Sequence, residues 1–223
     1  MDSDLKLSYG LTQCYLEVAR GAMMSIHHPS LTKEEFLKTF GPNPFANGIF
    51  SVVSISVLYS YLAIESFVNY QLYRVWERCN DGSEESKRFS GVFGEVATFE
   101  TLKTHKKSSK LGERIKSLCE ILGYQKPHDA IPNVWQEFKE LVEDSRHFFV
   151  HPHPGKEHFQ NHVGRIFTKT QAGKYVHVAE ELLKYLYRCS RKTPPDWLDK
   201  NTLLQFRGID ILVGQRGEEK GSA

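Results

Sequence analysis

The residues best suited to chemistry gather in one stretch, residues 144–154, which reads Asp-Ser-Arg-His-Phe-Phe-Val-His-Pro-His-Pro. Its arginine, Arg146, stays charged at any working pH and can hold a phosphate through two parallel hydrogen bonds. Its imidazoles, on His147, His151 and His153, titrate near neutral pH and can take or give a proton. These groups suit metal-free transesterification of RNA. A histidine would remove the proton of a ribose 2′-OH, while the arginine stabilises charge on the phosphorus oxygens.

The spacing within this stretch limits how the groups can meet. Pro152 restrains His151 from helical dihedral angles, so a helix arriving from upstream should end near Val150. Arg146 and His151 are five residues apart, which on an ideal helix is one turn plus about 140°. They would therefore not share a helix face. Either His151 leaves the helix, or the site is composed of residues from two chains.

The same histidines offer a metal-binding alternative. His147 and His151 are four residues apart, and His151 and His153 could chelate one ion. However, the chain lacks the His-Glu-x-x-His pattern of helical zinc enzymes, and Pro152 disrupts the helical geometry that the first pair needs. We therefore expect no metal ion and no other cofactor.

Each candidate also has a purely structural interpretation. Arg146 could form a surface ion pair with Asp144 or Glu143 at the end of its helix. His147 could be a second site residue or a solvated histidine at the helix end. His153 is more typical of a loop residue.

The elements that must position these residues are predicted to be helices, because apolar side chains recur every three or four residues in five segments. The segments are residues 7–25, 49–79, 111–122, 129–150 and 175–189. A capping-box pattern at residues 32–35 predicts a further short helix that ends at Gly41. Gly123 is placed to end the third segment as its C-cap.

The inward face of each helix follows from its apolar stripe. In the first helix these residues are Leu7, Leu11, Cys14, Val18, Ala22 and Ser25. In the second they are Phe50, Val53, Val57, Tyr61, Ile64, Val68, Leu72 and Val75. In the fourth they are Ile131, Trp135, Phe138, Val142 and Phe149.

Two polar residues of the second helix, Glu65 and Asn69, lie one turn apart beside its apolar stripe. Polar groups so close to a core usually have a hydrogen-bonding partner. We expect Glu65 to orient Arg146 or His147. The alternative is a satisfied buried polar pair with no role in a site.

The chain has 223 residues and a net charge of +2, and its composition is typical of a water-soluble globular protein. The four cysteines form no Cys-x-x-Cys pair, which disfavours a zinc or redox motif and suggests buried, reduced thiols in a cytoplasmic protein. The most apolar window, residues 49–63, is too short for a membrane span. A basic cluster at residues 103–110 includes Lys106 and Lys107, which could clamp a nucleic-acid backbone if they lie near the cleft.

Taken together, Arg146-His-Phe-Phe-Val-His151 resembles the Arg-x4–6-His motif of the HEPN superfamily (higher eukaryotes and prokaryotes nucleotide-binding domains). Ala63-Ile-Glu-Ser-Phe-Val-Asn69 on an earlier long helix and the proline after His151 strengthen the resemblance, which covers roughly residues 49–197. The residue after the arginine is often Asn in that family, whereas here it is His147.

The resemblance implies an all-α, HEPN-like bundle of four to five main helices with helical decorations at both ends. It implies a homodimer in which Arg146 and His151 of both chains line a shared cleft, with His147 assisting. The implied activity is metal-independent endoribonuclease cleavage of single-stranded RNA, often in a toxin or defence role under a protein antitoxin or regulator. The alternatives are a non-catalytic HEPN-like module that binds a nucleotide or protein, and a purely structural helical protein.

We expect one domain over residues 1–213, with its core at about 49–197 and a disordered tail at 214–223. No membrane partner is expected.

Overall fold

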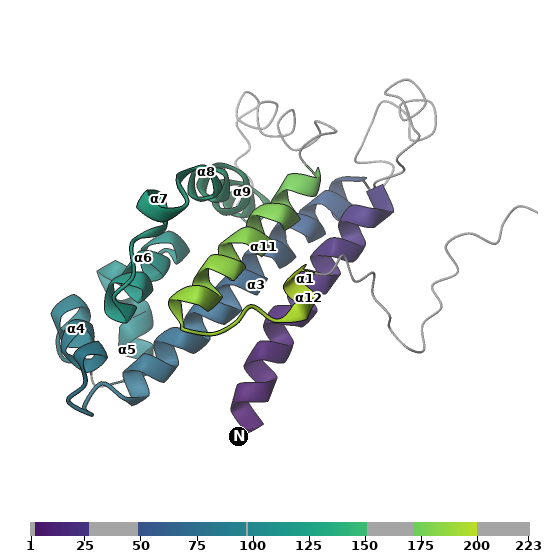
Figure 1. Ribbon diagram of the computed structural model, residues 1–223. Coiled ribbons are helices and arrows are strands. Elements are labelled where there is room, and N and C mark those ends of the chain that lie inside the picture. The colour runs from purple at the N-terminus through teal and green to yellow at the C-terminus, as the bar shows by residue number, and fades with distance from the viewer. Residues whose placement is uncertain (1–2, 27–48, 97, 151–171, 200–223) are drawn as a thin grey trace, which may run out of the picture.

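The computed structural model describes residues 3–26, 49–96, 98–150 and 172–199. Every regular element in these ranges is a helix, which confirms the all-α prediction (Figure 1). The short helix expected after residue 32 and the tail at 214–223 lie outside the described residues.

The long helix α3 (Ile49–Glu77) is the centre of the bundle. Helices α1 (Ser3–Ile26) and α11 (Ala172–Cys189) run beside it, as Figure 1 shows. Its predicted stripe is confirmed from Val53 to Val75, where Val57, Ile64 and Val68 are fully buried. The Val, Ile and Ser residues of its first third could have formed a strand, but the unbroken stripe of a 29-residue segment favours helix.

The predicted inward face of α1 is wrong by about one residue. Leu11 is 40% exposed and Cys14 is also exposed, whereas Thr12, Leu16 and Ala19 are fully buried. Neighbouring residues lie about 100° apart around a helix, so a shift of one residue selects a different face. The true stripe was hidden because it includes polar residues.

One of those polar residues, Arg20, joins three helices. Its Nε donates to Glu180 Oε1 of α11 over 2.7 Å, and its Nη1 donates to the carbonyl oxygen of Trp197 over 2.8 Å. Trp197 belongs to the short helix α12 (Asp196–Asp199), where Leu198 is buried against the bundle. The first residues after Pro195 therefore pack back across the bundle.

Short helices cover the C-terminal end of α3. They are α4 (Glu84–Phe93), α5 (Phe99–Thr104), the 3₁₀ turn η1 (Lys106–Ser108) and α6 (Leu111–Leu122). Ser83 and Thr98 cap α4 and α5 by accepting hydrogen bonds from backbone N–H groups. Gly123 adopts a left-handed conformation (φ 76°) after α6, which confirms its predicted C-cap role.

The predicted fourth helix contains an irregularity that the sequence did not reveal. After α7 (Pro127–Ala130), the chain forms α8 (Pro132–Glu137), a π-helical segment η2 (Phe138–Glu143) and α9 (Asp144–Val150). Trp135, Phe138 and Val142 face the core as expected. A π turn closes i→i+5 hydrogen bonds, so it changes the helical phase that links these residues to α9.

Buried apolar side chains from α1, α3, α4, α6, α8, η2 and α11 form one core. No described helix is both long and apolar enough to span a lipid bilayer.

The cysteines differ in their exposure, which corrects the expectation that all four are buried. Cys14 is exposed and Cys79 half-buried, whereas Cys119 and Cys189 are buried. Cys119 and Cys189 are far apart in sequence but interact between α6 and α11. A hydrogen bond with Cys189, together with burial, holds the pKa of the Cys119 thiol well above its ordinary value.

We predict that a water-soluble thiol reagent reacts with native Cys14 quickly and with Cys119 only after unfolding, because the thiolate is the reactive form and Cys119 is both buried and neutral. Quantifying modified thiols over time checks this. Cys14→Ser should remove the fast phase; a fast phase that persists undiminished in Cys14→Ser contradicts the assignment.

Candidate functional site

The structure positions one member of the predicted catalytic pair. Arg146 lies on α9, which packs against α3, and its guanidinium carbon is 5.0 Å from the centre of the Tyr61 ring. This cation–π contact holds a half-buried arginine in a fixed place. His151 and His153 lie outside the described residues. His147 belongs to α9, but its side chain is not among those described.

The π segment η2 helps to set the direction of Arg146. Ser145 is 3% exposed and hydrogen-bonds Tyr175 of α11, so that side of α9 faces the core. Arg146 is the next residue, about 100° further around the helix, and meets Tyr61 of α3. One additional residue in the preceding turn changes this direction by a similar angle. The irregular turn is therefore part of what places the guanidinium on the ring.

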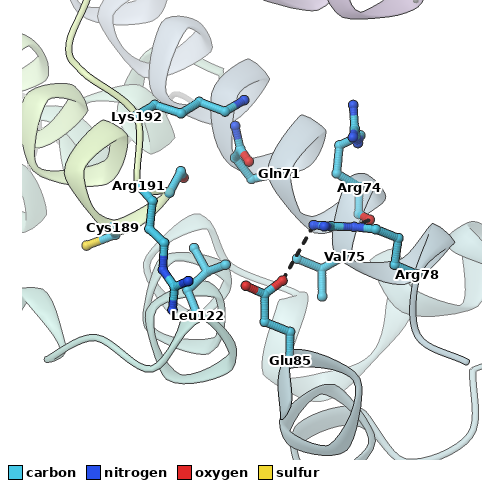
Figure 2. Close-up of a pocket in the computed structure, with 10 residues that line it drawn as sticks. Gln71, Arg74, Val75, Arg78, Glu85, Leu122, Cys189, Arg191 and Lys192 are labelled. Carbon is cyan, nitrogen blue, oxygen red and sulfur yellow. Dashed lines mark hydrogen bonds and ion pairs between the residues drawn. The ribbon is translucent and has the colours of Figure 1, made fainter. Parts of the chain in front are cut away.

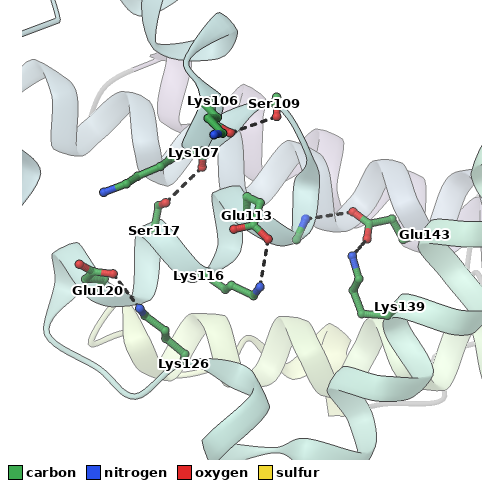
Figure 3. Close-up of polar contacts among 11 residues, drawn as sticks. Lys106, Lys107, Ser109, Glu113, Lys116, Ser117, Glu120, Lys126, Lys139 and Glu143 are labelled. Carbon is green, nitrogen blue, oxygen red and sulfur yellow. Dashed lines mark hydrogen bonds and ion pairs between the residues drawn. The ribbon is translucent and has the colours of Figure 1, made fainter. Parts of the chain in front are cut away.

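The acids nearest to Arg146 in sequence are not its partners. Glu143 accepts the backbone N–H of Gly112 over 3.1 Å and also binds Lys139, as Figure 3 shows. Asp144 is exposed. Across the described ranges, no carboxylate lies within ion-pair distance of Arg146. The simple surface ion pair considered for Arg146 is thus not what the structure contains.

Glu143 instead stabilises the first turn of α6. Lys110, the residue before this helix, provides no side-chain cap. The Glu143 carboxylate accepts the Gly112 N–H that would otherwise lack a partner, and its charge suits the positive end of the helix dipole. Packing of η2 against α6 therefore depends on a carboxylate that is no longer available to Arg146.

Glu65 and Asn69 share a partner that the sequence analysis did not predict. Arg114 of α6 donates to Glu65 Oε1 over 2.6 Å and to Asn69 Oδ1, and no contact between described residues joins Glu65 to Arg146. The predicted contact of Glu65 with His147 involves a side chain outside those described and stays a prediction. The side chains of Arg114 and Glu65 are 12% and 25% exposed. Sequence spacing could not reveal this pair, because Arg114 lies 49 residues from Glu65. The one signal in the sequence was that a cation, Arg114, stands next to the apolar stripe of α6.

Tyr61 lies between the Arg114 group and Arg146. Its pKa is raised to about 12: burial and the Glu65 carboxylate raise it, and the charges of Arg114 and Arg146 offset part of the rise. The phenol is therefore neutral at physiological pH. Sequence reasoning treated Tyr61 as packing alone, although it is the side chain that connects Arg146 to the polar residues of α3.

The predicted basic clamp, Lys106 and Lys107, is exposed on η1. The carbonyl of Lys107 accepts from Ser117 Oγ of α6 over 3.2 Å, and the Lys107 ammonium points away from Glu143 in Figure 3. No contact between described residues joins either lysine to Arg146. Their role toward a nucleic acid stays a prediction.

Among the described residues, no group of three His, Cys, Asp or Glu side chains is arranged to hold a metal ion. A comparison with protein-family models, with curated proteins and with solved structures found no match to this chain. The family resemblance therefore stays a prediction.

We predict that Glu65→Ala lowers the free energy of unfolding by about 1–3 kcal/mol, because Arg114 would remain mostly buried without its carboxylate. Glu65→Ala/Arg114→Met should cost less than the sum of the single variants, as measured by urea unfolding. The exposed Glu84–Lys87 pair is the control, and the effects of its two single variants should be additive. Additive effects at Glu65 and Arg114 would contradict the assigned contact.

We also predict that the contribution of Tyr61 to stability depends on pH. Its folded-state pKa of about 12 exceeds the unfolded value near 10, so its stabilising contribution is complete below about pH 10 and lost as pH rises through 12. Tyrosinate absorbance after a rapid pH jump, read before unfolding, should show that Tyr61→Phe removes one group that ionises near pH 12. Loss of a group that is already ionised by about pH 10 would refute this expectation.

Proposed function

We propose that this protein is a metal-independent endoribonuclease of the HEPN type, with Arg146 as the stabiliser of phosphate charge and His151 as general base or acid. The observation that supports the proposal is the state of Arg146. Its guanidinium is held by the Tyr61 ring, and no described carboxylate neutralises it. An arginine held in place without a counter-ion keeps its charge and hydrogen-bond donors available for a phosphate.

In the proposed reaction, a histidine takes the proton of the ribose 2′-OH and the oxygen attacks the adjacent phosphorus. The bond from phosphorus to the 5′ oxygen breaks, and that oxygen receives a proton. The products are a 2′,3′-cyclic phosphate and a free 5′-OH. Arg146 stabilises the charge that grows on the non-bridging oxygens, which a fixed cation does without reorganisation.

The five-residue spacing bears on how many chains form the site. Because Arg146 and His151 would not share the face of one helix, we propose a homodimer in which each cleft draws residues from both chains. His147 would assist, and Lys106 and Lys107 would hold single-stranded RNA through its backbone. A toxin or defence role in the cytoplasm, restrained by a protein regulator, would fit such an activity.

We predict that the wild-type protein cleaves single-stranded RNA in excess chelator, and that Arg146→Ala and His151→Ala each lower the rate by about 100-fold or more. Gel analysis should reveal 2′,3′-cyclic phosphate ends. Tyr61→Leu should lower kcat by removing the ring under Arg146, whereas Tyr61→Phe keeps the ring and the activity.

Matched controls are the exposed Arg188→Ala and His128→Ala, which should cleave as wild type does. Cleavage that survives both Arg146→Ala and His151→Ala would disprove the assignment. Loss of activity on chelation would instead favour the metal-binding interpretation. RNA binding by a folded dimer without turnover would favour the non-catalytic module.

A further inference from the structure

A cavity of about 260 Å³ lies between the last turns of α3, the beginning of α4 and the turn that follows α11 (Figure 2). Its nearest α3 residue, Gln71, is ten residues beyond Tyr61, or about 15 Å along the helix axis. The cavity is therefore separate from the region of Arg146. Sequence reasoning gave no indication of it, because its lining comes from segments more than 100 residues apart.

The lining of this cavity is strongly basic. It includes Arg74, Arg78, Arg191 and Lys192, and a single carboxylate, that of Glu85. The C-terminal ends of α3 and α11 are also close, and each carries roughly half a negative charge. The four cationic side chains outnumber the one carboxylate of the lining. One of these cations also serves a helix end, because Arg78 Nε donates to the Arg74 carbonyl over 3.2 Å.

The backbone at Arg191 supports a binding role. Arg191 has a φ of 54°. Among the described residues, it is the one non-glycine residue with a positive φ. It ends α11 in a Schellman motif, in which Lys192 N–H donates to Tyr187 O over 3.0 Å and Arg191 N–H donates to Arg188 O over 2.9 Å. Glycine is favoured at this position, and Gly123 fills it after α6. An arginine at this position strains the backbone, and its side chain lines the cavity.

Glu85 marks where an anion would bind. Its Oε2 lies 3.5 Å from Arg78 Nη2, and the two side chains are 28% and 53% exposed, so this ion pair is long and readily exchanged. Figure 2 shows the carboxylate directed toward Arg78 across the cavity, while the Cys189 sulfur points away. Val75 and Leu122 supply an apolar part of the wall.

We propose that this cavity binds a small molecule that carries a di- or triphosphate group, which displaces Glu85 from Arg78. Several cations around one cavity favour a ligand with more than one negative charge, and phosphate oxygens match the forked guanidinium geometry. The volume is slightly below the usual range for small-molecule pockets, about 300–1,000 Å³, so one compact ligand fits and an extended strand does not. The inference does not depend on the ribonuclease proposal.

Isothermal titration calorimetry on the full chain, in chelator, tests this binding site with inorganic pyrophosphate, ATP and adenosine as probes. Pyrophosphate and ATP should bind and adenosine should not. Arg78→Gln should weaken binding about tenfold or more. Glu85→Gln should strengthen it severalfold, because the competing carboxylate is gone.

Arg191→Gly separates binding from folding. It places the favoured residue in the left-handed position, so the melting temperature should stay unchanged or rise while pyrophosphate binding falls. Lys87→Gln is the charge-matched control on α4. Lys87 pairs with Glu84 outside the cavity, so its variant should bind as wild type does.

Three results would overturn the proposal. One is the absence of pyrophosphate and ATP binding at millimolar concentration. Another is an equal loss of binding in Lys87→Gln and Arg78→Gln, which would indicate non-specific attraction. The third is binding of a single-stranded RNA without terminal phosphate that Arg78→Gln abolishes, while pyrophosphate does not bind. That last result would make the cavity part of an RNA surface.

Discussion

Burial of α3 on several sides is the constraint on which the rest of the structure depends. Helices α1, α6, α9 and α11 all contact it, so a polar group on its flank must find its partner inside the bundle. Arg114 reaches across from α6 to satisfy Glu65 and Asn69, and Arg146 reaches across from α9 to the Tyr61 ring. The central helix thereby organises charge as well as apolar packing.

Local sequence rules predicted those features that local physics determines. The stripe of α3, the left-handed Gly123 and the helices that became α6 and α11 all follow from periodicity and capping within a few residues. The inward face of α1 was missed because Thr12 and Arg20 are buried, and the cost of burying Arg20 is met by Glu180, which lies 160 residues away. No rule of spacing includes such a distant partner.

The candidate site shows the same difference between features that local sequence determines and contacts that depend on the tertiary fold. Arg146 was identifiable as a residue type suited to phosphate chemistry, but its contact with Tyr61 depends on how α9 meets α3. Glu143, a sequence neighbour, proved to serve the first turn of α6. Arg191 and Arg78 had no sequence signature, because a basic cavity exists only when the ends of α3 and α11 come together. Helix existence is a local property, whereas the partners of charged groups are a tertiary one.

The π segment η2 uncouples two properties of a helix: which residues it buries in the core, and where its later side chains point. In an uninterrupted α-helix, the residues that fill the core determine where every later side chain points. A turn with one extra residue breaks that relation: Trp135 and Phe138 keep their core positions, while the face presented by α9 is set independently. In evolutionary terms, the gain or loss of a single residue in this turn could redirect the arginine without requiring a new core.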